Sequence, residues 1–126
     1  NIGLSICYDV RFPHLYRDMA QAGAQIITVP AAFARPTGEA HWDTLLRARA
    51  IETGCYILAP AQCGEHDPDG PRKTYGHSMI VDPWGEICVT LASTPSICYH
   101  TLNLNLVEQA RARVPSLLHD RPYLGP

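Results

Sequence analysis

The chain has 126 residues and a net charge of −2, and 46% of its residues are hydrophobic against 17% charged. This balance is typical of a globular domain and excludes a disordered chain, while the charge argues against nucleic acid or an anionic membrane as a partner. No apolar run approaches the roughly 18 residues that span a bilayer, and no signal-peptide pattern is present, so we expect a cytoplasmic protein.

The first part of the chain reads as a strand, a helix and a second strand. Residues 2–6 form a short apolar run, and residues 12–22 carry apolar side chains three or four positions apart, ending at Gly23. Residues 25–29 are rich in β-branched side chains. The connection between the two strands is short enough for a parallel βαβ unit.

A loop over 31–38 is expected next, followed by the longest helix over 39–53, which Gly54 ends. The expected inner face of this helix consists of Trp42, Leu45, Leu46 and Ile51. Residues 55–61 read as a third strand, and 64–76 as an exposed loop rich in Gly, Pro and Asp. The remaining elements expected are strands over 77–81, 86–91 and 98–104 and a helix over 107–113, followed by an extended tail. These elements predict an α/β chain with helices on one face of a mixed sheet and another layer on the other.

The five cysteines are odd in number and include no C-x-x-C pair, which favours neither a disulfide framework nor a zinc site. We expect those inside apolar runs to be small buried hydrophobic residues, namely Cys55, Cys63, Cys88 and Cys98. Cys7 differs, because it ends the first strand and the polar segment YDVR follows at once. In α/β sheets this strand-to-turn position presents ligands and nucleophiles, although a buried structural cysteine fits the local pattern as well.

A nucleophilic thiol needs a base or a positive neighbour to lower its pKa. Six histidines are available, but no spacing singles one out. The only lysine, Lys73, lies in a polar stretch where we expect it to be solvated. The chain also opens on Asn1 directly into a strand, so we expect a truncated or processed chain, or a gene fragment, with any lysine activator outside it.

Three stretches carry a family resemblance: SICYDVRFP, PAAFARPTGEAHWDTLLRARAIETGCYILAPAQCG and YGHSMIVDPWGEI. Together they resemble the nitrilase superfamily of carbon–nitrogen hydrolases, and most of all its Nit branch on the side of the deaminated-glutathione amidases. The resemblance runs in order over nearly the whole chain. It implies an α-β-β-α sandwich of which residues 1–126 are roughly the C-terminal half, an incomplete domain.

The resemblance further implies a Glu-Lys-Cys triad that hydrolyses a small amide through a thioester. Cys7 corresponds to the nucleophile, and the backbone N–H of Tyr8 to an oxyanion donor. The glutamate and lysine precede the cysteine in the family by far more than six residues and have no position here. We therefore expect these 126 residues alone to be inactive, and the exposed sheet face to make them poorly stable alone.

The expected substrate is a small carboxamide with a carboxylate-bearing chain, first deaminated glutathione and then ω-amides such as α-ketoglutaramate. The chemistry implied needs no metal or organic cofactor, and a homodimer or larger homo-oligomer is expected. An N-carbamoyl amino acid or nitrile hydrolase remains an alternative, as do a non-catalytic binding or assembly remnant and a papain-like Cys-His hydrolase.

Other residues near Cys7 are given roles from their types and positions. Asp9 and Arg11 flank the turn, and we expect them to brace it or pair with each other, with Arg11 also a candidate for substrate contact. The residues after the second strand are candidates for a substrate wall, namely Ala32, Phe33 and Thr37. We also expect an Arg49–Glu52 helix pair, a packed Trp42 and a hairpin anchor at Trp84.

Overall fold

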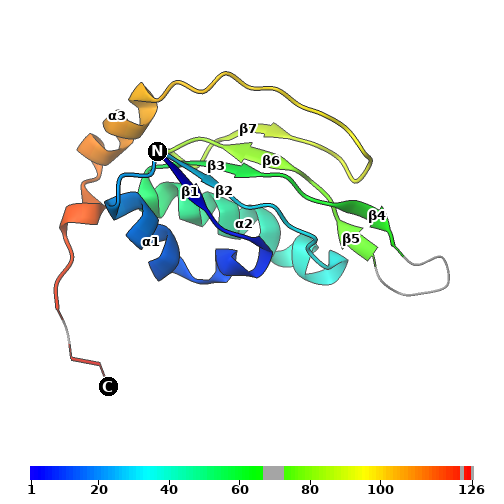
Figure 1. Cartoon of the computed structure of the whole chain (residues 1–126), viewed down its shortest axis with the longest axis horizontal. Coiled ribbons are helices and arrows are strands. Elements are labelled where there is room, and N and C mark those ends of the chain that lie inside the picture. Colours follow the sequence, from blue (N-terminus) through cyan, green and yellow to red (C-terminus); the bar gives the residue numbers. More distant parts are fainter. Residues whose placement is uncertain (67–72, 123, 126) are drawn as a thin grey trace.

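The computed structural model describes residues 1–66, 73–122 and 124–125. Its larger sheet has strands in the order β1-β2-β3-β6-β7, and helices cover one face of this sheet (Figure 1). The strands are β1 (Ile2–Leu4), β2 (Ile26–Thr28), β3 (Tyr56–Ala59), β6 (Met79–Val81) and β7 (Ile87–Thr90). The helices are α1 (Pro13–Gln21), α2 (Arg35–Thr53) and α3 (Asn105–Arg113), with short 3₁₀ turns at Cys7–Arg11 and Ser116–Leu118.

The first three strands are parallel, and α1 and α2 connect them. This confirms the predicted βαβ unit, and the third predicted strand continues it as a further parallel strand. The hairpin of β6 and β7 adds antiparallel strands beyond β3. All three parallel strands therefore end at one edge of the sheet, which is where Cys7 begins its turn.

One row of side chains across the sheet forms the centre of the core. Ile27 is in register with Ile57, which is in register with Val81, and all three are fully buried. They cluster with Trp42 and Leu46 of α2, which are also fully buried. Burying each large apolar side chain contributes about 1.5–3 kcal/mol, so this layer between sheet and helices holds the fold together.

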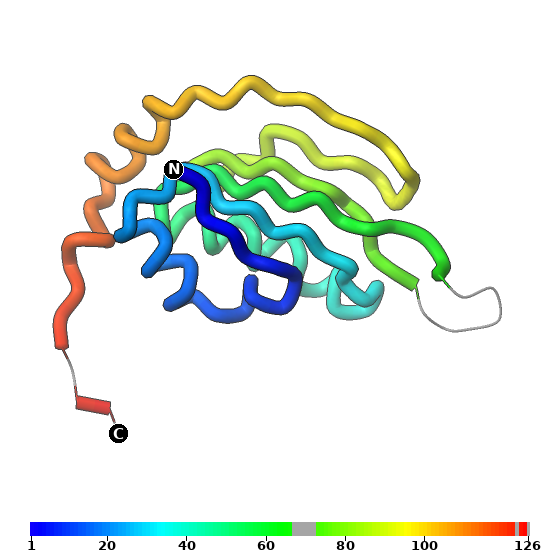
Figure 2. Tube along the Cα trace, in the orientation of Figure 1, coloured from blue at the N-terminus to red at the C-terminus, as the bar shows by residue number. Residues whose placement is uncertain are grey.

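The opposite face of the sheet is apolar and open at β1, where Ile2 is 62% and Leu4 76% exposed. Residues 98–104 run over the sheet as an extended segment (Figure 2), and the hydroxyl of Tyr56 donates to the Asn103 carbonyl at 3.3 Å. The strand predicted for 98–104 is therefore wrong. Because this segment crosses a face and does not line an edge, its backbone forms no ladder with the described strands.

Helix α2 begins at Arg35, four residues before the predicted start. Proline is compatible with the first helical turn, so Pro36 does not delay the helix. Gly38 lies inside the helix, where a Cβ would lie 2.4 Å from the Tyr75 side chain, so the close approach of Tyr75 requires glycine at this position. Gly54 ends the helix in the left-handed conformation at φ 59°, as predicted.

The predicted inner face of α2 is correct for Trp42 and Leu46 but wrong for Ile51, which is 56% exposed. Nine residues at about 100° each place Ile51 roughly opposite Trp42 around the helix. Arg49 takes a buried position instead, with 5% exposure.

The predicted exposed loop over 64–76 contains two short antiparallel strands, β4 (Cys63–Glu65) and β5 (Lys73–Tyr75). The part of that prediction over 67–72 lies outside the described residues. Lys73 pairs with Glu65 at 2.5 Å on this hairpin, and its side chain is exposed, as expected for a solvated lysine.

No helix in the described residues combines the length and hydropathy needed to cross a membrane.

Candidate active site

Cys7 lies in a left-handed backbone conformation at the end of the first strand. Its φ is +47°, which L-residues other than Gly, Asn and Asp seldom adopt. The strand pairing continues up to this point, because Ser5 N donates to Thr28 O at 3.1 Å and Cys7 N donates to Pro30 O at 2.9 Å. Such a conformation costs of order 1–3 kcal/mol and persists only where the surroundings hold it.

Asp9 holds the turn that follows Cys7. Its Oδ2 accepts a hydrogen bond from Ile6 N at 2.9 Å, and Asp9 N donates to Ile6 O at 3.0 Å. Arg11 does not pair with Asp9 among the described ion pairs. Asp9 is therefore the elbow brace that the sequence suggested, and an Asp9–Arg11 ion pair is not formed.

Arg11 points instead toward aromatic rings and a histidine. Its guanidinium carbon lies 5.3 Å from the Tyr8 ring centroid and 5.2 Å from that of Phe33. Its Nη1 lies 3.3 Å from His41 Nδ1. This cation is thus held within reach of the turn while keeping no carboxylate partner among the described ion pairs.

Half-buried Cys7 opens onto a concavity of about 620 Å³ beyond the carboxyl ends of the three parallel strands. The wall combines residues that follow β1, β2 and β3 with two serines from later in the chain. Its residues are Ile6, Cys7, Pro30, Ala31, Ala32, Pro60, Ala61, Gln62, Ser78 and Ser96. Apart from Cys7, none of these residues has an ionisable side chain.

Of the three residues predicted to form a substrate wall, only one lines the concavity around Cys7. Ala32 lines the concavity, whereas Phe33 is 4% exposed and packs against Trp42 with ring centroids 4.9 Å apart. Thr37 is exposed at the start of α2, and its hydroxyl donates to Ala34 O at 3.1 Å. Neither Phe33 nor Thr37 is part of the wall around Cys7.

Sequence reasoning missed Gln62, Ser78 and Ser96 as wall residues. Gln62 follows the third parallel strand, so the rule that ligands lie beyond carboxyl strand ends could have found it. The two serines come from the antiparallel part of the chain, and no sequence signal brings them to this edge. The Ser78 hydroxyl accepts a hydrogen bond from Ala61 N at 2.9 Å, which fixes it against the end of β3.

No histidine belongs to the concavity wall within the described residues. Three of them have other partners: His41 contacts Arg11, His66 Nε2 lies 2.7 Å from the Thr74 hydroxyl, and the His77 ring stacks on Tyr75 at 3.9 Å. Lys73 is paired with Glu65 on the hairpin. The chain therefore offers no Cys-His pair of the papain kind in the part that the structure describes.

The other cysteines are less uniformly buried than expected. Cys55 is fully buried, and burial raises the pKa of its thiol, whose Sγ donates to Ala24 O at 3.3 Å. Cys63, Cys88 and Cys98 are only half-buried.

Nowhere in residues 1–66, 73–122 and 124–125 do three His, Cys, Asp or Glu side chains converge as a metal ion would require.

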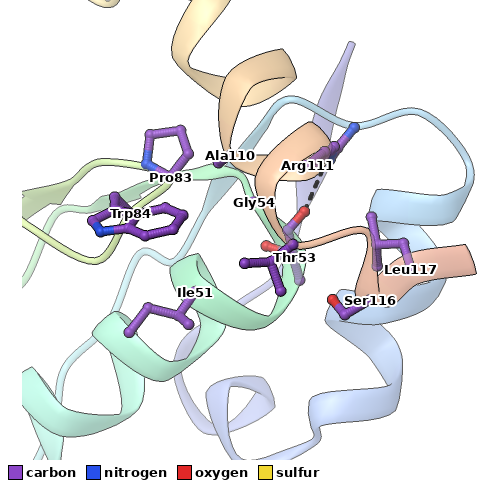
Figure 3. Close-up of a pocket in the computed structure, with 10 residues that line it drawn as sticks. Ile51, Thr53, Gly54, Pro83, Trp84, Ala110, Arg111, Ser116 and Leu117 are labelled. Atoms are coloured by element: carbon purple, nitrogen blue, oxygen red, sulfur yellow. Dashed lines mark hydrogen bonds between the residues drawn. The ribbon is translucent and has the colours of Figure 1, made fainter. Parts of the chain in front are cut away.

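A second cavity of about 310 Å³ lies between the end of α2, the turn before β7, and α3 (Figure 3). Its lining is mostly apolar, with Trp84 facing Ile51 across the space. Arg111 reaches the end of α2, where its Nε donates to Thr53 O at 3.1 Å. This second cavity shares no lining residue with the Cys7 concavity, and no cysteine lines it.

Trp84 contributes to this second region more than to its own hairpin. It is 45% exposed and lies under Arg113 of α3, whose guanidinium carbon is 4.3 Å from the ring centroid. Asp82 organises the turn instead, since its Oδ1 accepts from Trp84 N at 2.8 Å and from Glu86 N at 2.9 Å. Asp82, and not the predicted Trp84, therefore anchors the hairpin turn, whereas Trp84 ties the turn to α3.

This fold and this cysteine turn define a family. Residues 1–112 match the model for the carbon-nitrogen hydrolases, and the chain belongs to that family, which confirms the predicted membership. It is 52% identical over 123 residues to the deaminated glutathione amidase of Bos taurus, covering 98% of this chain and 37% of that protein. The chain thus spans little more than a third of that relative's length.

Solved structures agree with this assignment. The NitFhit protein of C. elegans superposes with a TM-score of 0.91 at 48% identity, covering 96% of this chain and 29% of that one. A mutant of the amidase from Nesterenkonia sp. AN1 gives a TM-score of 0.65 at 36% identity over 75% of this chain and 35% of that one. That structure shows covalent addition of the acetamide moiety of fluoroacetamide at the active site cysteine. The predicted nitrilase-type fold class is confirmed.

Proposed function

We propose that Cys7 is the nucleophile of an amidase that hydrolyses a small carboxamide to a carboxylic acid and ammonia. The observation that carries the proposal is the left-handed Cys7 at the end of β1, opening onto a concavity at the carboxyl edge of the sheet. Family membership and a related amidase that carries an acetamide adduct on its active-site cysteine support it.

The reaction proceeds in two steps. Cys7 Sγ bonds to the amide carbon, and the carbonyl electron pair moves onto oxygen, where the backbone N–H of Tyr8 donates a hydrogen bond. The C–N bond then breaks, the nitrogen takes up a proton and leaves as ammonia, and a thioester remains on Cys7. Water attacks the thioester, which releases the acid and restores the thiol.

Proton transfers in both steps need a general base and acid, and the concavity wall around Cys7 supplies neither. We propose that a glutamate and a lysine outside these 126 residues complete the site, and that residues 1–126 are part of a larger hydrolase domain. This part of the proposal rests on the family resemblance and on the chain's 37% share of the bovine relative.

The substrate that we propose is a carboxamide whose chain also bears a carboxylate. Arg11 belongs to the turn that follows Cys7, and its planar guanidinium suits bidentate binding of a carboxylate. Ala32 would contact the amide end from the wall, while Phe33 supports Arg11 and Thr37 lies farther along the same edge. Deaminated glutathione is the first candidate, since a relative at 52% identity is named for it, and ω-amides such as α-ketoglutaramate are the second.

The test is ammonia release by the intact protein from deaminated glutathione and from α-ketoglutaramate. Cys7→Ser should remove the activity, whereas Cys88→Ser, at another half-buried thiol on β7, should leave it within about twofold. Turnover that survives Cys7→Ser would rule out the proposal. Arg11→Ala should raise KM for these carboxylate-bearing amides far more than for acetamide.

Product analysis separates this function from its alternatives. An N-carbamoyl amino acid hydrolase would release carbon dioxide along with an amine and ammonia, and a nitrile hydrolase would act on substrates with no amide. A non-catalytic remnant would bind without releasing ammonia from any of them.

We also propose a cytoplasmic homodimer or larger homo-oligomer, which light scattering of the intact protein and imaging of its location in cells would test.

A further inference from the structure

Buried polar groups hold the segment just before Cys7. The Ser5 hydroxyl lies 2.9 Å from Thr28 O and 2.6 Å from the hydroxyl of Tyr16, which is fully buried in α1. A serine hydroxyl has one proton, and Ser5 gives it to the Thr28 carbonyl. Tyr16 is therefore the donor to Ser5, and since burial raises the pKa of Tyr16, its phenol keeps that proton at neutral pH.

A second buried group holds the segment just after Cys7. Arg49 of α2 is 5% exposed, and its Nε donates to the Val10 carbonyl inside the 3₁₀ turn at 2.9 Å. Its guanidinium carbon also lies 5.7 Å from the Tyr16 ring centroid, and its Nη1 donates to Glu52 at 2.8 Å. The expected Arg49–Glu52 pair is thus confirmed, and Arg49 and Tyr16 form one connected group.

Burying an arginine is energetically unfavourable, because its charge loses water, unless its N–H groups find hydrogen-bond acceptors in the protein. Arg49 places one of those donors on a carbonyl of the very turn that keeps Cys7 at φ +47°. Tyr16 and Ser5 fix the other side of the same residue. A left-handed cysteine between two such fixed points has little freedom to relax to negative φ.

We propose that Tyr16 and Arg49 are positioning residues, which hold the Cys7 turn so that its thiol and the Tyr8 N–H face the same carbonyl group. This inference rests on the proposed function of Cys7. Neither Tyr16 nor Arg49 lines the concavity, so loosening the turn slows bond formation while leaving substrate binding largely intact. Misplacement of reacting groups by an ångström costs on the order of a hundredfold in rate.

The test compares Tyr16→Phe with Tyr56→Phe in the intact protein. Tyr56 is a matched control, because it is 1% exposed and its hydroxyl bonds to Asn103 O, away from the turn. Three readouts are compared: the Cys7 backbone signature, given by its NMR coupling constant and carbon shifts, which report φ; kcat for deaminated glutathione; and KM for the same substrate. Tyr16→Phe should shift or average the left-handed signature and lower kcat about tenfold or more, with KM within about twofold. Tyr56→Phe should leave all three unchanged.

Ser5→Ala adds a second, small variant that removes the acceptor of the same bond. Ser5→Ala also removes the bond to Thr28 O, but both changes break the Tyr16–Ser5 bond, so the double variant Ser5→Ala/Tyr16→Phe should lose less than the two single effects combined. Arg49→Lys, which keeps the charge but loses the Nε donor, should lower kcat in the same way.

The inference is overturned if Tyr16→Phe keeps either the Cys7 signature or a kcat within twofold of the Tyr56→Phe value. It is also overturned if the Ser5 and Tyr16 effects simply multiply. Failure of the proposed function is recognised separately, because Cys7→Ser would then retain turnover. That result would overturn both proposals without any variant at Tyr16, Ser5 or Arg49.

Discussion

At the scale of single residues, close contacts place tight limits on substitution. Gly38 shows this best, because the side chain of Tyr75 occupies the space where a Cβ would lie, 2.4 Å away. Tyr75 in turn stacks on His77, whose carbonyl accepts from Trp42 Nε1 at 2.9 Å. The helix, the hairpin strand β5 and the segment leading to Ser78 in the wall are thereby packed against one another.

Gly38→Ala should therefore destabilise the protein, although alanine is the better helix former. The overlap with Tyr75 costs about 1–3 kcal/mol, which exceeds the gain of roughly 1 kcal/mol from helix propensity. Urea unfolding measures the difference. Ala40→Gly at an exposed position of the same helix serves as the control and should cost about 1 kcal/mol. A more stable Gly38→Ala variant would contradict the packing described.

At the scale of elements, the C-terminal segment is tied to α1 by polar contacts. Arg17 Nε donates to Asp120 Oδ1 at 2.8 Å, and Gln21 Nε2 donates to Asp120 Oδ2 at 2.6 Å. The hydrogen bond from Arg17, followed by that from Gln21, lowers the pKa of Asp120 below its ordinary value of 3.8. Both donors favour the charged carboxylate, so the tether depends on pH.

A carboxyl group whose folded pKa is lowered stabilises the fold above its unfolded pKa, and that contribution is lost as pH falls through the folded value. The Asp120 tether should thus be complete at neutral pH and release only below pH 3.8. Carbon NMR titration of the Asp120 carboxyl measures this directly. Arg17→Ala should move the midpoint up toward 3.8, and an unchanged midpoint would show that the contact does not persist in solution.

Local patterns predicted the elements whose apolar spacing is unambiguous and failed where tertiary contacts decide. The βαβ unit and most of the long helix follow from periodicity and from Gly54. The early start of α2 could not be predicted, because Pro36 and Gly38 read as a loop and the Tyr75 contact that requires glycine at position 38 is not visible in the sequence. Residues 98–104 have strand-like composition but no free sheet edge beside them.

For the candidate site, too, the sequence predicted some residues and not others. Cys7 follows from its position at a strand end and from the family resemblance, and Ala32 from the parallel-strand rule. For Arg49 the sequence predicted only a helix pair with Glu52, and its contact with Val10 O depends on how α2 packs against the turn. Ser78 and Ser96 reach the wall only through the antiparallel half of the sheet.

At the scale of the whole molecule, a helix layer covers one side of the sheet, while much of the other side is apolar and exposed. Ile2, Leu4 and Ile6 are all more than half exposed there, next to the Cys7 concavity. Exposed apolar patches of this kind mark surfaces that bind another layer or partner. We infer that the layer proposed to cover this sheet face also carries the glutamate and lysine proposed for the site around Cys7.

The 126 residues produced alone should therefore bind a dye specific for exposed apolar surface, such as ANS, and release no ammonia from deaminated glutathione. The intact protein should show the reverse pattern. Measured side by side at equal concentration, robust turnover by residues 1–126 alone would contradict the proposal that a glutamate and a lysine outside them are required.

Acid-quenched mass spectrometry shows whether Cys7 carries the proposed acyl intermediate. The intact protein is mixed with deaminated glutathione, quenched within the first turnovers, digested at low pH and analysed peptide by peptide. We expect the mass of the acyl group on Cys7 and on none of the other four cysteines. Ammonia release without an adduct on Cys7, or with an adduct on another cysteine, would contradict it.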